Sequence, residues 1–140
     1  MTELSCWSDL LLYLTVARRR YQGTPELAVV DYELANRRSL VFLRPVPTSP
    51  APDASTWLSL SVQLCSEREL VMRAALVTNL VLRVGALGVT AGKVVLQQTL
   101  PFGGLLVVHL EQAMGSLVKL AHEIYRPTLR EDDPYGYMYR

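Results

Sequence analysis

The clearest alternation of hydrophobic and polar positions lies between Trp57 and Cys65. Apolar and polar residues take turns along it: Leu58, Ser59, Leu60, Ser61, Val62, Gln63 and Leu64. Because successive side chains of a strand point to opposite faces, this period of two predicts a strand with one apolar and one polar face. Burial on one side is typical of an antiparallel sheet that is covered on one face.

Four further segments are predicted to be strands: residues 27–34, 40–44, 80–87 and 93–100. Residues 36–38 predict a turn between the first two, and residues 88–92 a slightly long hairpin turn between the last two. The stretch 45–53 holds Pro45, Pro47, Pro50 and Pro52. Since proline suits neither a helix interior nor a central strand, this stretch predicts an extended loop.

Helical spacing of apolar residues appears over residues 3–22, 67–79 and 105–125. Gly23 and Pro25 are predicted to end the first helix. Gly115 lies inside the last one, where glycine costs about 1 kcal/mol relative to alanine. Glycine at this position is therefore expected to allow a close backbone approach.

The middle predicted helix begins with a capping box, in which Ser66 caps and Glu69 reaches back. Its apolar residues surround most of the helix: Leu70, Val71, Met72, Ala74, Ala75, Leu76 and Val77. A helix that is apolar nearly all round is buried on more than one side. In a domain this small, one side faces the sheet and the other is expected to pack against another chain.

The predicted order of elements is α-β-β-β-α-β-β-α. Too few helices separate the strands for a doubly wound parallel sheet, so we expect an α+β fold with an antiparallel sheet packed with helices. The first and last helices are expected to cover one face of the sheet. Residues 1–126 are predicted to form a single domain, followed by an acidic and tyrosine-rich tail over residues 127–140.

Composition narrows the class of protein. The 140 residues are 50% hydrophobic and 19% charged, which excludes global disorder. A mean hydropathy of +0.19 favours a standing partner. The net charge of +1 argues against nucleic-acid binding. No apolar run approaches the roughly 20 residues that a membrane helix needs. The start of the chain is acidic, unlike a secretory signal. We therefore expect a cytoplasmic protein in which Cys6 and Cys65 are free thiols.

Candidate catalytic groups do not combine into a site. His109 and His122 lie roughly 220° apart around the last predicted helix, so they do not share a metal ion within one chain. Residues 85–93 resemble a phosphate-binding loop, but Val94 stands where serine or threonine is needed. Asp31 and Glu33 lie on one strand face and are expected to be solvated. The sequence therefore predicts a protein that is not an enzyme and uses no cofactor or metal.

A resemblance adds to this interpretation. The segment LVLRVGALGVTAGKVVLQQTLPFGGLLVVHLEQAMGSLVKLAHEIY reads as strand, glycine-containing turn, strand, small residues and long helix. In this order it resembles the class I type III secretion chaperones and the related YbjN-like family. The resemblance implies a bacterial homodimer that holds an extended segment of a client protein along hydrophobic grooves and sheet edges.

The resemblance also implies that the middle helix and an adjoining strand form the two-fold interface. We expect the interface to use Val71, Met72, Ala75, Leu76, Val81 and Arg83. A partner protein is expected to bind at Leu27, Val29, Trp57, Tyr135, Tyr137 and Tyr139. The pI near 7.8 differs from that of the usually acidic secretion chaperones. It leaves open a second function, a scaffold or regulatory adaptor of the same fold that docks on a folded partner in a cytoplasmic signalling or polarity complex.

Overall fold

A computed structural model describes residues 3–17, 21–24, 26–34, 37–46, 56–66, 68, 72–82 and 84–124. Its elements follow in the order α1 (Trp7–Val16), β1 (Tyr21–Thr24), β2 (Leu27–Leu34), β3 (Arg37–Val46), β4 (Trp57–Ser66), α2 (Met72–Val81), β5 (Ala86–Thr90), β6 (Lys93–Pro101) and α3 (Val107–Ile124). The predicted α+β class with an antiparallel sheet is confirmed.

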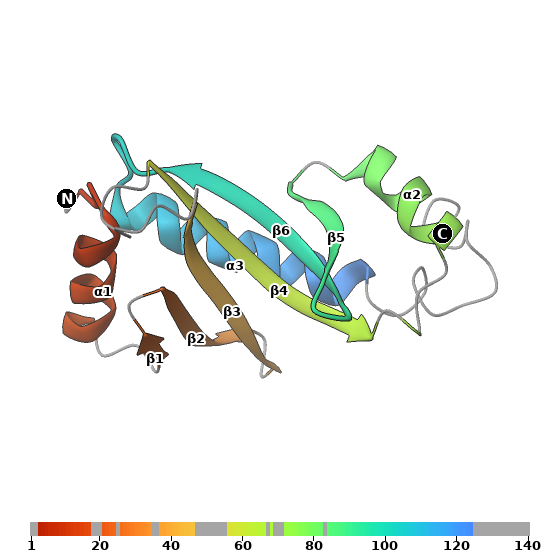
Figure 1. The fold of residues 1–140 in the computed structure, drawn as a ribbon, viewed down its shortest axis with the longest axis horizontal. Coiled ribbons are helices and arrows are strands. Elements are labelled where there is room, and N and C mark those ends of the chain that lie inside the picture. The colour runs from red at the N-terminus through yellow and green to blue at the C-terminus, as the bar shows by residue number, and fades with distance from the viewer. Residues whose placement is uncertain are drawn as a thin grey trace.

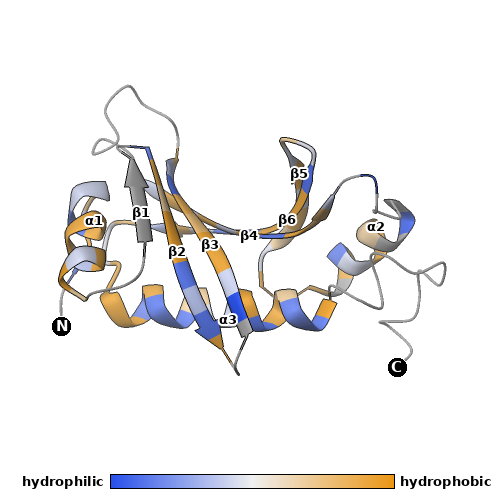
Figure 2. Ribbon diagram, turned by 90° about the horizontal axis from the view of Figure 1, so that it is seen from below, coloured by the Kyte–Doolittle hydropathy of each residue, from blue (hydrophilic) through white to orange (hydrophobic). Residues whose placement is uncertain are grey.

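The strands form one six-stranded sheet in the order β1-β2-β3-β4-β6-β5, and every neighbouring pair is antiparallel. The long helix α3 runs beneath one face of the sheet, while α1 lies at the β1 end and α2 beyond the β5 end (Figures 1 and 2). The core lies between α3 and the sheet and includes Leu10, Val30, Leu60, Leu96 and Leu117, all with no exposed surface. No described helix lies over the opposite face of the sheet (Figure 2).

The alternation along β4 predicted its faces correctly up to a bulge. Leu58, Leu60 and Val62 are buried toward α3. The register with β6 shifts between Gln63 and Cys65, so that Cys65 pairs with Val94. A bulge inserts one extra residue into a strand, so beyond it the odd-numbered residues of β4, rather than the even-numbered ones, point inward. Accordingly, Cys65 is buried while Leu64 is half-buried.

The first predicted helix was too long at both ends. Glu3 bridges Leu106, and the N–H of Leu4 donates to the carbonyl of Leu105, so the chain is extended before α1. Beyond the helix, residues 21–24 form β1, paired with residues 27–30 of β2. Pairing with β2 outweighs the apolar spacing that had suggested a helix, because tertiary contacts override weak local propensity.

The predicted strand over residues 80–87 was also wrong in its first half. Helix α2 continues to Val81, and β5 begins at Ala86. A continuous apolar run does not separate buried helix from buried strand by periodicity. The hairpin turn is shorter than predicted, since Gly88–Thr90 belong to β5 and only Ala91 and Gly92 form the turn. Both turn residues have positive φ, as a two-residue hairpin turn requires.

Three smaller boundaries differ from the prediction. Arg37 and Arg38 belong to β3 rather than to a turn. Pro45 lies inside β3 and is paired with Leu58 of β4. The pairing of β3 with β2 ends at Leu43, so the missing N–H of Pro45 removes no hydrogen bond to β2. Ser66 ends β4 and accepts a hydrogen bond from the N–H of Arg68 at 3.3 Å, whereas Met72 begins α2. Residues 67 and 69 lie outside the described part.

Candidate binding surfaces

The described helices cover one face of the sheet and leave the opposite face, here called the outer face, without a helix over it (Figure 2). Strand alternation places apolar side chains of β2, β3 and β4 on this face. They are Leu27, Val29, Leu40, Phe42, Val46 and Trp57. Leu40 and Trp57 are 51% and 46% exposed, so the outer face offers apolar contact area to a second molecule.

The strand register shows where this apolar surface stops. Val29 is paired with Phe42, Phe42 with Ser61, and Ser61 with Gln97. The row is therefore apolar on β2 and β3 and polar on β4 and β6. A surface of this kind, half apolar and half hydrogen-bonding, is typical of sites that bind a polypeptide.

An ion pair borders the apolar half. The guanidinium of Arg38 on β3 binds the carboxylate of Asp31 on β2, with Nε of Arg38 at 3.3 Å from Oδ1 of Asp31. The hydrogen bond to Asp31 and its negative charge raise the pKa of Arg38 above its usual value. Asp31 was expected to be solvated; its side chain keeps 21% of its surface exposed, and Arg38 of the neighbouring strand lies next to it.

The sequence found part of this surface. Leu27, Val29 and Trp57 were predicted to bind a partner, and all three lie on the outer face. Leu40 and Phe42 were missed, although the alternation within residues 40–44 already placed them on the face opposite Val41 and Leu43. Tyr135, Tyr137 and Tyr139 lie outside the described residues, so their role stays a prediction.

Helix α2 forms a second candidate surface at the far end of the sheet (Figure 1). Ala75 faces its own chain, in a small cluster with Cys65 and Val94. Leu76 and Leu80 are 61% and 84% exposed. The helix therefore does not hide its apolar residues within this chain.

The predicted interface residues are described in part. Ala75 is 7% exposed and packs within its own chain, whereas its neighbour Leu76 points outward. Residues 71 and 83 and the side chains of Met72 and Val81 lie outside the described part. Exposed Leu80 was not among the predicted interface residues.

The side chain of Asn79 links α2 to β5 by two hydrogen bonds. The N–H of Leu87 donates to Oδ1 of Asn79 at 2.7 Å, and Nδ2 of Asn79 donates to the carbonyl of Leu87 at 3.3 Å. Both main-chain groups of Leu87 are thus bound by a single amide. No sequence pattern indicated this contact, since the two residues belong to a helix and a strand whose docking is a tertiary feature.

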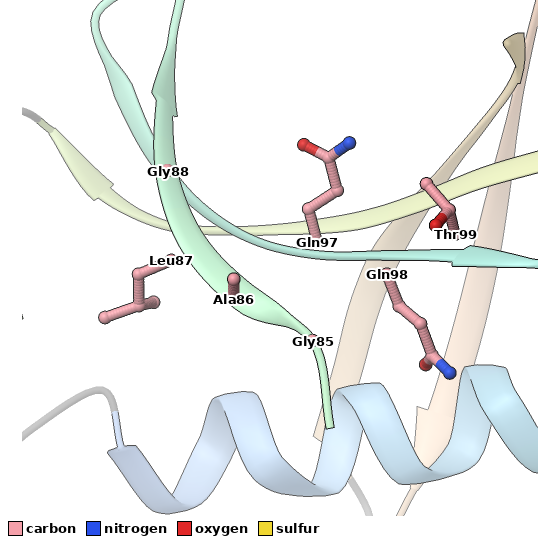
Figure 3. Close-up of a pocket in the computed structure, with 7 residues that line it drawn as sticks. All are labelled: Gly85, Ala86, Leu87, Gly88, Gln97, Gln98 and Thr99. Atoms are coloured by element: carbon pink, nitrogen blue, oxygen red, sulfur yellow. The ribbon is translucent and has the colours of Figure 1, made fainter. Parts of the chain in front are cut away.

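An open hollow of about 420 Å³ lies where β5 begins beside β6. It is lined by Gly85, Ala86, Leu87, Gly88, Gln97, Gln98 and Thr99. Figure 3 shows Gln97 and Thr99 pointing to one side of β6 and Gln98 to the other, toward α3. The lining contains no acid, base or thiol, so the hollow lacks the groups of a catalytic site.

Titratable groups elsewhere in the described part of the chain are also dispersed. Nε2 of His122 lies 2.8 Å from Oγ of Ser39, and His109 is exposed on α3. Cys6 and Cys65 are not joined by a disulfide. No three His, Cys, Asp or Glu residues in the described ranges lie close enough to hold a metal ion.

Comparison of the whole fold with solved structures identifies its type. The chain superimposes on a chain of the HopA1–SchA chaperone–effector complex with a TM-score of 0.55 and 16% identity, covering 81% of this chain and 87% of that one. It also superimposes on a chain from the Yersinia pestis type III secretion chaperone SycH in complex with a stable fragment of YscM2, with a TM-score of 0.51 and 16% identity, covering 81% and 93%.

The fold is that of a type III secretion chaperone. No protein-family model and no curated protein matches the sequence. The assignment of the fold therefore rests on the structural comparison, and it agrees with the secretion-chaperone resemblance noted in the sequence. The predicted likeness to the YbjN-like family is not confirmed, because no protein-family model matches. Within the described residues, no helix of the chaperone fold has both the length and the apolar character needed to span a bilayer.

Proposed function

We propose that this chain is a non-enzymatic, homodimeric protein-binding module that holds a segment of a client protein. The observation that carries this proposal is the outer face, on which half-exposed apolar side chains of β2 and β3 stand next to polar rows of β4 and β6. Apolar pockets and strand edges together suit an extended peptide. The similar folds belong to complexes of a chaperone with an effector and of a chaperone with a stable fragment of another protein, which supports a client-binding role.

The proposed homodimer is formed by a second copy of the chain that packs against α2. Exposed Leu76 and Leu80 support this, because a small domain with exposed leucines on one helix gains by burying them in an interface. The proposed interface is centred on Leu76 and Leu80 and includes Val71, Met72, Val81 and Arg83, whereas Ala75, which was also expected there, packs within its own chain. Light scattering after size-exclusion chromatography is expected to give twice the chain mass.

The matched test of the dimer exchanges apolar residues of α2 for charged ones. The double variant Met72→Glu, Leu76→Glu is expected to elute as a monomer, because two carboxylates would be buried without partners. The control variant Gln112→Glu, on the exposed side of α3, is expected to remain dimeric. A dimeric Met72→Glu, Leu76→Glu protein would show that the interface lies elsewhere.

Client binding is tested by photocrosslinking in cells. A photoreactive phenylalanine derivative is placed at Leu40 on the outer face, and at exposed Lys119 on α3 as the control. We expect a crosslinked protein at Leu40 and none at Lys119. Equal crosslinking at both positions, or none at Leu40, would refute client binding on the outer face.

The state of the captured protein separates the two functions that the sequence left open. If the crosslinked segment is degraded quickly by protease when free and protected when bound, the chain holds an unfolded client. If the captured protein is folded and protease-resistant on its own, the chain is instead an adaptor that docks on a folded partner, and the client-holding proposal fails.

A further inference from the structure

Helix α3 ends beside the strand ends at which β3 begins. In its last turn, Nε2 of His122 lies 2.8 Å from Oγ of Ser39, the third residue of β3. Ser39 points toward α3, and by strand alternation its neighbour Leu40 points to the outer face, where it is 51% exposed. The chain therefore leaves α3 close to one end of the outer face, on the opposite side of the sheet (Figure 2).

Residues 125–140 follow α3 and lie outside the described residues. The sheet and α3 are layers each about 10 Å thick. Residues 125–131 span about 23 Å when extended, which is enough to pass the strand ends and reach the outer face. Residues 132–140 then remain, and their extended length of about 30 Å matches that of the ten-residue strand β3.

The order of residues in this segment matches the order of side chains along β3. The acidic residues 131–133 come first, and three tyrosines follow at every second position: Tyr135, Tyr137 and Tyr139. Along the outward side of β3, Arg38 comes first, and Leu40 and Phe42 follow. Alternate residues of an extended chain share one side with a repeat of about 6.6 Å, so the tyrosines have the spacing of the outward side chains of β3.

Arg38 offers a partner for the acidic residues. Its side chain is 58% exposed. Asp31 accepts from its Nε and Nη2, whereas a guanidinium carries five N–H donors. Arg44 adds a second exposed guanidinium further along the outward side of β3. Because the carboxylates of Asp31 and Glu33 belong to β2, charge favours a path of the acidic segment over β3 rather than over β2.

Tyrosine suits a surface that is apolar on one half and polar on the other. Its ring packs on apolar side chains, while its hydroxyl needs a hydrogen-bond partner. Phe42 on β3 is paired with Ser61 on β4, and Ser61 with Gln97 on β6. A tyrosine ring that packs on Phe42 therefore directs its hydroxyl to this polar row.

We propose that residues 131–139 of this chain fold back onto the outer face, with the acidic residues at Arg38 and the tyrosines over Leu40 and Phe42. The contact is made by side chains across the face of the sheet, so it requires no strand edge and no movement of α2. It rests on the proposed function in one respect, since the segment occupies the surface proposed for a client. Because the segment is tethered, it competes with a client at a high effective concentration.

Photocrosslinking in the purified full-length chain tests this contact without a client. A photoreactive phenylalanine derivative is placed at Leu40, and at Leu12 on α1, a similarly exposed leucine at the β1 end, as the matched control. We expect Leu40 to crosslink to residues 131–139 at the mass of one chain, roughly tenfold more than Leu12 does. No such crosslink, equal yields at both positions, or a crosslink only at twice the chain mass would overturn the proposal.

A charge substitution identifies the partner of the acidic residues. Arg38→Gln is expected to lower the yield of the Leu40 crosslink by roughly threefold, because exposed ion pairs contribute modestly. Lys119→Gln, which removes the same charge from the exposed side of α3, is the control and should leave the yield unchanged. Equal yields in these two variants would overturn the placement of the acidic residues at Arg38.

A second variant covers the case in which Arg38→Gln disturbs the pairing of β2 with β3. The triple change Glu131→Gln, Asp132→Asn, Asp133→Asn leaves every described residue intact and should give a similar loss of crosslinking. Adding Arg38→Gln to it should cause little further loss, because both changes remove the same interaction. An unchanged yield in the triple variant, or fully additive losses, would overturn the proposal.

Replacing the three tyrosines by serine separates this inference from the proposed function. In cells, the variant is expected to raise client capture at Leu40 by roughly threefold, because a competitor is removed, and unchanged capture would overturn the competition. The purified chain contains no client. Absence of the intrachain crosslink there refutes the fold-back alone, whereas an intrachain crosslink without client capture in cells refutes client binding alone.

Discussion

The hydroxyl of Tyr32 on β2 lies against the backbone of α3 at Gly115, where a Cβ atom would stand 2.9 Å from it. Glycine in a helix interior costs about 1 kcal/mol relative to alanine. The approach of Tyr32 explains why α3 carries that cost. The sequence led us to expect a close backbone approach at Gly115, and what lies there is a side-chain hydroxyl.

Replacing Gly115 by alanine is therefore expected to stabilise the protein less than a glycine-to-alanine change in a helix usually does. In the wild-type background, Gly115→Ala should leave the free energy of unfolding unchanged or lower it, because the Tyr32 hydroxyl must move. In a Tyr32→Phe background the same change should stabilise by about 1 kcal/mol. Urea unfolding of the four proteins measures the difference. An equal gain in both backgrounds would show that Tyr32 does not constrain this position.

Gly85 and Gly88 offer a matched pair at the start of β5. Gly85 has φ +70°, and a Cβ atom there would lie 2.5 Å from the backbone oxygen of Gln97, whereas Gly88 has open space around it. Gly85→Ala is expected to lower the free energy of unfolding by about 2 kcal/mol and to loosen β5 from β6.

The companion variant Gly88→Ala should raise the free energy of unfolding by about 0.5 kcal/mol, since alanine restricts the unfolded chain more than glycine. Urea unfolding and amide exchange at Leu96 and Gln97 report both changes. If the two variants behave alike, the close contact at Gly85 is not what holds β5.

Helix α1 is tied to α3 by one polar contact between remote parts of the chain. The hydroxyl of Tyr13 donates to Oε1 of Glu111 at 2.5 Å. Tyr13→Phe is expected to lower the free energy of unfolding by about 1 kcal/mol, because a hydrogen bond to a carboxylate is stronger than a neutral one. In a Glu111→Ala background the loss should be clearly smaller. Additive losses in the double variant would contradict a direct bond.

The hairpin turn between β5 and β6 contains one residue in a costly conformation. Ala91 has φ +49° and precedes Gly92, at φ +75°. Asparagine adopts this left-handed region more readily than alanine, and Asn-Gly is the preferred pair in such turns. Ala91→Asn is therefore expected to raise the melting temperature, by the equivalent of about 0.5 to 1 kcal/mol. A lower melting temperature would mean that the turn has a different geometry in solution.

Much of the fold followed from local patterns. The alternation along residues 57–63 located the central strand and its buried face, and the spacing in residues 105–125 located α3 with nearly its observed bounds. The same alternation placed Leu27, Val29 and Trp57 on the face opposite the buried one, and their role in binding stays a prediction. These features were predictable because the period of apolar residues reports directly which side chains are buried.

Element boundaries were less predictable where apolar residues are continuous. Residues 80–87 suit a helix and a strand equally, and the chain divides them between α2 and β5. Residues 21–24 had the spacing of a helix but pair with β2. In both places, a partner segment decided the conformation.

By itself, the sequence determined the α+β class, the antiparallel sheet and the buried face of each well-patterned strand. The tertiary structure alone decided that Asn79 meets Leu87, that Arg38 pairs with Asp31 and that Leu80 is exposed on a helix. The physical reason is that burial repeats with the period of a single element, whereas a hydrogen-bond or ion-pair partner comes from another element whose position depends on the whole fold.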